Sequence, residues 1–323
     1  MRRGASIERE ERAGTTRPFS ARNRAPLRCG CALALAALAG LAGVVRAEIE
    51  LRGLRVEAGY TADDNVTRAP KGDALADGIL GVRLSTSLAV PVSTRTRAVF
   101  QGFAGGERFR KYKGLSHNFI GGQGEFQFRP SGEFSAPTYS AFARSTVEQY
   151  DSTLRDGYRH LFGVSVFKPL TDRLQLFGAL ARNISDGKSA VFDARSTSVR
   201  GNVDWLLGRW DTFYLGGEYR SGDSISTVCF ACDSIRTLGF VNTASPNIVQ
   251  DDAFDDTVRD AYRLKAHTVI ATLGYNHAFG AGQSVDLSWR RAQSAVQDAV
   301  APASGSDLNY TVNQYSLAYL VRF

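Results

Sequence analysis

The feature of this 323-residue sequence that most restricts its fold is a repeated alternation of apolar and polar residues. Leu80, Val82 and Leu84 alternate with Arg83 and Ser85, and similar segments of about ten residues recur as far as the C-terminus. Because successive residues of a β-strand point to opposite faces, such segments predict strands with one apolar and one polar side. Residues 48–323 contain no apolar run of the roughly 20 residues that a membrane-spanning helix needs.

The alternation predicts an all-β chain of about twelve antiparallel strands. Their predicted ranges are 51–62, 78–90, 94–108, 117–128, 134–147, 158–168, 173–184, 193–207, 211–221, 261–277, 284–293 and 309–323. Short connections rich in turn residues alternate with longer polar ones, which is typical of a transmembrane up-and-down β-barrel with short periplasmic turns and long extracellular loops. A soluble β-sandwich is the alternative; it would also alternate polar and apolar residues, but it has no reason to sort its loops by length.

The first 47 residues differ from the rest of the chain. An apolar, alanine-rich stretch at residues 29–45 follows Arg22, Arg24 and Arg28 and precedes Ala47. A basic lead, a short apolar stretch and a small residue at the cleavage site predict a secretory signal peptide at residues 1–47, with the barrel at 48–323. Retention as a membrane anchor is the alternative, disfavoured by the short apolar length. The 28 residues before Cys29 make a long lead, which favours a start codon further downstream.

The formal net charge of +7 reflects mainly this N-terminal segment. It holds nine of the 39 Lys and Arg residues and three of the 32 Asp and Glu residues, so the remainder is nearly neutral. A nucleic-acid-binding protein usually carries its basic excess along a face or an arm of the folded domain. The charge distribution therefore argues against a nucleic-acid partner.

The last ten residues carry the most specific strand pattern. Aromatic or apolar residues occupy every second position at Tyr315, Leu317, Tyr319, Val321 and Phe323. This segment resembles the C-terminal strand that the barrel-assembly machinery of Gram-negative bacteria recognises. The resemblance implies that this machinery is a partner of the chain and that residues 309–323 form the last strand of the barrel.

The start of the predicted barrel also resembles a known family. Residues 56–68, VEAGYTADDNVTR, are similar to the first strand and loop of uncharacterised β-barrel porins from proteobacterial outer membranes. Some relatives occur near polysaccharide-export genes, which implies transport of glycan chains or small solutes. The resemblance implies a fold and an outer-membrane location, with membrane lipid and lipopolysaccharide as surroundings. It transfers no catalytic residue to this sequence.

If the apolar face of each strand contacts lipid, the charged residues between must point into the lumen. On residues 261–277 this assigns Tyr262, Leu264 and Ile270 to the outer face. The predicted lumen-lining residues are Arg55, Glu57, Arg83, Arg200, Asp204, Glu218, Arg220, Arg263, Lys265, His267, Arg290 and Arg322. Their basic excess favours anionic solutes, although interlocking ion pairs that only fill a narrow barrel remain an equal alternative.

The other chemistry-bearing residues give weaker signals. Barrel phospholipases combine a histidine, a serine and an Asn or Asp, since a nucleophile needs an oriented base. His117, His160, His267 and His277 lie in no segment that resembles outer-membrane phospholipase A or the omptin proteases. We therefore expect no catalytic residue.

The longest predicted loop contains a cysteine pair, Cys229 and Cys232, which in an oxidising compartment predicts a local disulfide rather than a redox centre or half a zinc site. Two groups of loop aspartates either bind a hard cation such as calcium or are solvated charge. These aspartates are Asp63, Asp64, Asp73 and Asp77, and Asp251, Asp252, Asp255 and Asp256. Because no known calcium-loop spacing is present, no metal ligand or cofactor is assigned.

The sequence thus predicts an outer-membrane barrel that acts as a porin-like channel or export conduit for small solutes, anionic ones favoured, or glycan chains. A structural or surface-assembly barrel with a plugged lumen and partner-binding loops is the first alternative, and a barrel enzyme is the second. Neither the oligomeric state nor the transported substrate follows from the residues.

Overall fold

The structure, a computed structural model, describes residues 50–229, 248–254, 258–280, 282–297 and 308–323. The strands are β1 (Glu50–Asp63), β2 (Asp77–Ser93), β3 (Thr96–Phe109), β4 (His117–Phe128), β5 (Thr138–Tyr150), β6 (Gly157–Pro169), β7 (Leu174–Gly187), β8 (Ala194–Leu206), β9 (Asp211–Val228), β10 (Ile248–Gln250), β11 (Asp260–Ala278), β12 (Gln283–Val296) and β13 (Tyr310–Arg322). Short 3-10 helices follow β3, β5 and β7, namely η1 (Lys113–Leu115), η2 (Thr153–Arg155) and η3 (Ala190–Phe192). Among the described residues, no helix is long and apolar enough to cross a membrane.

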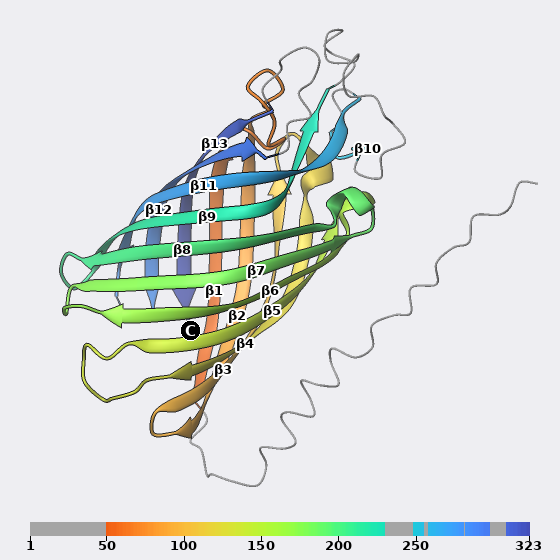
Figure 1. Cartoon of the computed structure of the whole chain (residues 1–323). Helices are drawn as coiled ribbons and strands as arrows, with labels where there is room; N and C mark the ends of the chain where they lie inside the picture. The colour runs from red at the N-terminus through yellow and green to blue at the C-terminus, as the bar shows by residue number, and fades with distance from the viewer. Residues whose placement is uncertain (1–49, 230–247, 255–257, 281, 298–307) are drawn as a thin grey trace, which may run out of the picture. The chain divides into compact units, whose positions relative to one another are not determined.

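The strands form one closed antiparallel barrel (Figure 1). Each wall strand pairs with the next along the chain, β9 pairs with β11, and β13 pairs with β1 to close the sheet. Closure leaves the wall without a free edge, so every wall strand has a hydrogen-bonded neighbour on both sides. The predicted all-β, twelve-stranded, up-and-down fold is confirmed. The additional short strand β10 pairs with the first three residues of β11 and was not predicted.

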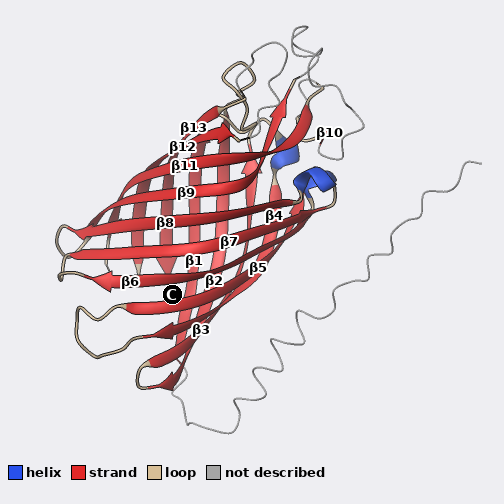
Figure 2. Cartoon of the chain, in the orientation of Figure 1, coloured by secondary structure: helices blue, strands red, loops and turns tan. Residues whose placement is uncertain are grey.

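The connections sort to the two ends of the barrel, and the 3-10 helices lie at the end with the longer ones (Figure 2). The connections at this long-loop end are 64–76, 110–116, 151–156, 188–193, 229–259 and 297–309, and those at the short-turn end are 94–95, 129–137, 170–173, 207–210 and 279–282. The segment 129–137 is longer than predicted because β5 begins only after Pro137. Proline has no N–H to donate to a sheet ladder, so the strand starts one residue later.

The outer face of the wall is apolar and exposed. Leu80, Ile120 and Leu215, on three different strands, expose 61, 62 and 58% of their surface. On one neighbouring strand each, they are in register with Tyr60, Val147 and Leu273 respectively. The residues between them turn inward and are mostly polar. A soluble protein would bury its apolar sheet face, so this inside-out arrangement requires an apolar medium around the wall.

One predicted strand face was wrong. On β11 the residues exposed on the outer face are Val269 and Leu273, whereas Ile270 is 4% exposed and points inward. The odd-numbered positions of β11 therefore face outward, which places the side chains of Arg263, Lys265 and His267 outside the lumen. The error arose because β11 carries apolar residues at both odd-numbered and even-numbered positions, so the alternation alone does not show which face is outside. The outer face is identified by the pairing of Val269 and Leu273 with outward-facing residues of β9.

This assignment predicts a position-dependent cost for a charge on β11. Leu273→Arg, on the outer face, is expected to lower the free energy of unfolding in lipid vesicles by about 2–4 kcal/mol. Asn276→Arg, whose inner-face partner across the sheet is Asp286, is expected to change it by less than about 1 kcal/mol. Equilibrium denaturant titration followed by tryptophan fluorescence measures both values. Equal costs would mean that the faces of β11 are assigned incorrectly.

Candidate functional site: the lumen and its capped mouth

The lumen contains most, but not all, of the residues that the sequence assigned to it. Cross-strand register puts nine of the predicted residues on the inner face: Arg55, Glu57, Arg83, Arg200, Asp204, Glu218, Arg220, Arg290 and Arg322. Further inner-face charges that the sequence reasoning missed are Arg97, Glu107, Glu125, Arg144, Glu148 and Arg159. Several lie on β3–β5, where glycine and alanine occupy many outer positions and weaken the apolar signal.

Four arginines are spaced regularly around the inner wall. Arg83, Arg144, Arg200 and Arg290 lie on β2, β5, β8 and β12, which is every third strand in the order of the closed barrel. We call these four residues the arginine ring. Arg144 is close enough to Arg83 and Arg200 to be repelled by their charges. Within the described part of the chain, none of the four lies within 4.0 Å of a carboxylate oxygen.

Aromatic rings contact three members of the arginine ring. The guanidinium carbon of Arg83 lies 4.4 Å from the ring centroid of Phe103, and that of Arg200 lies 5.2 Å from Phe177. Arg144 also approaches Phe103 and donates hydrogen bonds of 2.8 and 2.6 Å to the Gln123 side-chain oxygen. Stacking on a ring face orients a guanidinium without neutralising its charge. These groups can therefore still bind an anion.

Two carboxylates without an ion-pair partner among the described residues, Asp204 and Asp286, lie closer to the short-turn end than the arginine ring. Asp204 follows Arg200 by four residues on β8, and Asp286 precedes Arg290 by four on β12, each displacement being about 13 Å along its strand. Asp204 accepts a hydrogen bond from Asn202, and Asp286 accepts one of 2.9 Å from the Tyr214 hydroxyl. Each of these two carboxylates therefore lies below a member of the arginine ring on the same strand.

Above the arginine ring, a cavity of about 440 Å³ opens in the lumen towards the long-loop end. Four arginines contribute to its lining: Arg68, Arg159, Arg220 and Arg290. Three of them are paired, with Asp63 at 2.7 Å, Glu148 at 3.1 Å and Glu218 at 2.8 Å respectively. Only Arg290 belongs both to this cavity and to the arginine ring, so it links the two levels.

The long-loop mouth of the barrel is covered by a packed cap. Its centre is the strap, which we define as residues 248–254. Three buried apolar clusters each include strap residues, and together they contain residues from every other long connection. Those partners are Val66, Ala69 and Leu75, Tyr112 and Leu115, Leu154, Val191 and Phe192, and Leu308. The strap starts beside β11 and reaches the β3–β4 connection, which lies across the barrel from β11 in the strand order.

A buried ion pair fastens the strap. Asp251, whose side chain is fully buried, pairs with Arg155 of η2 and accepts a 2.9 Å hydrogen bond from the Thr227 hydroxyl. The same carboxylate accepts a 3.2 Å bond from the backbone N–H of Ala253. A buried carboxylate that loses its cation partner is strongly destabilised. The position of the strap therefore depends on Asp251.

The far end of the strap is fitted by shape. Ala253 is completely buried, and a Cβ atom at Gly114 would lie 2.5 Å from its Cα. The next strap residue, Phe254, packs against Tyr112 with ring centroids 5.2 Å apart. A glycine in η1 is thus what allows the strap to approach the opposite wall.

Four of the described loop aspartates, Asp63, Asp73, Asp77 and Asp251, are buried, whereas Asp64 and Asp252 are exposed. Asp63 binds Arg68, and the carboxylate of Asp77 accepts backbone N–H bonds from Gly78, Lys111 and Tyr112. No group of three or more His, Cys, Asp or Glu side chains in the described ranges could hold a metal ion. The solvated-charge alternative is wrong for the four buried aspartates, three of which accept hydrogen bonds that order the loops. Asp255 and Asp256 lie outside the described residues.

The remaining predicted groups lie apart from the lumen. Ser145 and His160 face outward, with Oγ and Nδ1 3.1 Å apart, and among the described residues no carboxylate or amide orients the imidazole. Cys229 is disulfide-bonded, but Cys232 lies outside the described residues, so the pairing of these two cysteines stays a prediction. Tyr315, Leu317, Tyr319, Val321 and Phe323 all lie on the outer face at the end of the chain.

No protein-family model matches the sequence, and no curated protein matches it. Solved structures with a similar backbone include an outer-membrane channel from Pseudomonas putida F1, with 11% identity, a TM-score of 0.48 and coverage of 84% of this chain and 96% of that chain. The KdgM porin, solved with disordered oligogalacturonate, has 8% identity, a TM-score of 0.41 and coverage of 83 and 99%. An anion-selective porin from Comamonas acidovorans has 9% identity, a TM-score of 0.37 and coverage of 86 and 100%. Similarity at this level of sequence identity concerns the fold and assigns no site or substrate to this chain.

Proposed function

We propose that this chain is an outer-membrane channel that admits small anionic solutes or anionic glycan chains through an arginine-lined lumen. The observation that carries the proposal is the arginine ring: four guanidinium groups inside a closed barrel, none with a carboxylate partner among the described residues. The ring is surrounded by a wall that is apolar outside. A signal peptide at residues 1–47 would deliver the chain to that membrane.

The membrane location is supported by the outer wall. Leu, Ile, Val and Phe side chains are exposed on the outer face all around the barrel, and lipid is the medium in which such exposure is favourable. In lipid, a closed barrel is the β-structure in which every backbone N–H and C=O group has a hydrogen-bond partner. Arginine or lysine on the lipid face would cost about 2–4 kcal/mol at the midplane. The charges of the arginine ring, on the inner face, avoid that cost.

The preference for anions rests on which charges remain unpaired. Arg55, Arg159 and Arg220 bind carboxylates on or near their own strands, so their fields are largely cancelled. The arginine ring keeps its charge at mid-height in the lumen, where low-dielectric walls strengthen the field. An anion entering from the cavity above meets these groups before it reaches Asp204 and Asp286. Rings of Arg or Lys favour anions in other pores.

Planar-bilayer recording of the purified full chain tests the proposal. Current steps are expected, with a reversal potential in a KCl gradient whose sign shows chloride to be more permeant than potassium. Cation preference would overturn the role of the arginine ring and leave a channel of another selectivity. If neither the native chain nor a chain with the strap released gave any current steps, the channel function itself would be rejected.

The cap supports one alternative, a structural or surface-assembly barrel whose lumen stays closed. Buried or partly buried residues from all the other long connections pack in the same three clusters as strap residues, which favours a rigid cap. The two functions differ in what happens when the strap is loosened. A channel then conducts more, whereas a closed structural barrel stays silent because its lumen is blocked elsewhere.

A further inference from the structure

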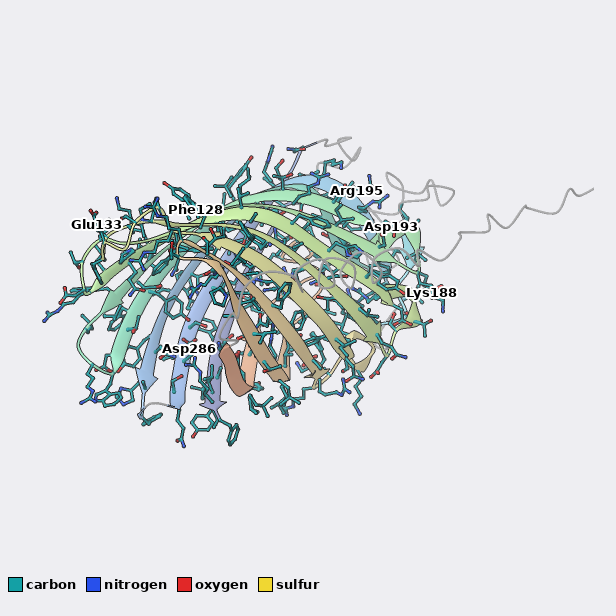
Figure 3. The ribbon with its side chains drawn as sticks, turned by 90° about the horizontal axis from the view of Figure 1, so that it is seen from below. Phe128, Glu133, Lys188, Asp193, Arg195 and Asp286 are labelled. Atoms are coloured by element: carbon teal, nitrogen blue, oxygen red, sulfur yellow. The ribbon has the colours of Figure 1, made fainter. Side chains whose placement is uncertain are left out.

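A basic pocket lies on the outside of the barrel, at its long-loop end. It has a volume of about 430 Å³, and Arg195, Arg263 and Lys265 contribute to its lining together with Asp193 and Asp223. Figure 3 shows Arg195 and Asp193 near each other at this end, far from Phe128 and Glu133 at the short-turn end. The pocket is formed by β8 and β11 on either side of β9. We call Arg195, Arg263 and Lys265 the outer basic triad.

The acidic groups of this pocket are already engaged. Asp223 accepts a 2.8 Å bond from the backbone N–H of Arg195 and pairs with the Lys265 ammonium at 2.7 Å. The Asp193 carboxylate accepts a 2.9 Å bond from the Gly187 N–H, and its carbonyl oxygen accepts a bond from the Arg263 guanidinium. The guanidinium of Arg195 is exposed and forms no ion pair with any described carboxylate. The pocket therefore carries net positive charge.

The residues next to the pocket on the same strands show where it lies along the barrel axis. Val199 lies four residues below Arg195 on β8, and Val269 lies four residues below Lys265 on β11, and both are exposed apolar residues of the outer face. Between the two levels, the Tyr219 hydroxyl bonds His267 at 2.6 Å, and their rings stack. Tyrosine at the edge of an apolar band marks a membrane–water interface. The outer basic triad is thus at headgroup height.

We propose that the outer basic triad binds the phosphate group of an anionic lipid in the leaflet that surrounds the long-loop end. Arg195 supplies a planar fork suited to two phosphate oxygens, and Lys265 supplies a point charge beside it. Arg263, held by the Asp193 carbonyl, closes the pocket on the β11 side. The acyl chains of such a lipid would run down over Val199 and Val269. The proposal rests on the proposed membrane location.

Thermal unfolding of the purified full chain in neutral detergent tests the site, with a diphosphorylated lipid A added as the probe. The lipid is expected to raise the unfolding midpoint of the native chain. Its apparent Kd should weaken by about 100-fold in the triple variant Arg195→Gln, Arg263→Gln, Lys265→Gln, since each charge near a headgroup contributes about a factor of five. The matched control is Arg108→Gln, an exposed outer-face arginine on β3, which should keep the native affinity.

Three outcomes would overturn the site. The triple variant could bind the phosphorylated lipid as tightly as the native chain, or the dephosphorylated lipid could stabilise both chains equally. Inorganic phosphate at the same phosphate concentration could also reproduce the shift, which would indicate a general anion site rather than a lipid site. Failure of the membrane location is distinguishable, because the native chain would then not insert into neutral phosphatidylcholine vesicles at all.

Discussion

Replacing Asp251 with asparagine should raise the open probability of the barrel in planar bilayers by about tenfold or more. The variant leaves Arg155 without its carboxylate partner, and removing one member of a buried pair typically costs 3–5 kcal/mol. Arg155 is partly exposed, so we expect only part of that cost, about 1.4 kcal/mol or more, to favour the released strap. Single-channel recording of the native and variant chains, at equal protein and salt, measures the ratio.

The control for this variant is Asp172→Asn, which removes the same charge from an exposed turn at the opposite end of the barrel. It should leave the open probability unchanged. Both variants should retain the heat-modifiable gel mobility of a folded barrel, because the wall strands are not altered. If Asp251→Asn folded normally but opened no more often than the native chain, the strap would not gate the lumen.

A steric change provides an independent way to release the strap. Gly114→Ala introduces a Cβ atom 2.5 Å from the Cα of Ala253, which forces the strap or η1 to move. Gly132→Ala places the same methyl group in open space at the short-turn end. Gly114→Ala should raise the open probability and Gly132→Ala should not. Asp251→Asn and Gly114→Ala would then give the same result, one by loss of a charge and the other by a steric clash.

The second large effect concerns ion selectivity. The triple variant Arg83→Gln, Arg144→Gln, Arg200→Gln should shift the reversal potential in a KCl gradient strongly towards potassium, so that most of the chloride preference is lost. The variant leaves Arg290 as the only member of the arginine ring that keeps its charge, while Asp204 and Asp286 are unchanged, and acidic side chains in a pore favour cations. Glutamine keeps polarity and hydrogen-bonding capacity at each position. The measurement uses the strap-released background so that currents are large enough to analyse.

Matched controls come from the paired arginines. Arg159→Gln and Arg220→Gln remove the same charge from positions whose carboxylate partners, Glu148 and Glu218, lie within 3.1 and 2.8 Å. Each of these single variants should shift the reversal potential towards cation preference, because it leaves a carboxylate without its arginine partner. The shift should be smaller than that of the triple variant, because only one charge is removed. A triple variant with unchanged anion preference would show that selectivity is set elsewhere in the lumen.

The barrel was predictable from the sequence because strand alternation and connection length are local properties. The faces of β2 and β8 followed directly, since Leu80, Val82 and Val199 fall on one parity and Arg83 and Arg200 on the other. β11 failed because Val269 and Ile270 are adjacent and both apolar. Only pairing with β9, which is information from another part of the chain, decides between them.

The arginine ring and the cap could not be predicted for a related reason. Nothing in the residues around Arg83 or Arg144 indicates that they lie three strands apart on the same inner wall. Asp251 looked like solvated loop charge because its partner Arg155 is almost a hundred residues away. The buried residues of this protein lie mainly where the loops meet. Loop packing produces no periodic pattern in the sequence from which such contacts could be predicted.

The cap is also coupled to closure of the barrel wall. One of its clusters joins Ala69, from the first long connection, to Leu308, from the last. Leu308 lies just before β13, which pairs with β1 to close the sheet, so this cluster is complete only in the closed barrel. The two ends of the described chain are therefore held together twice, by backbone pairing in the wall and by apolar side chains in the cap.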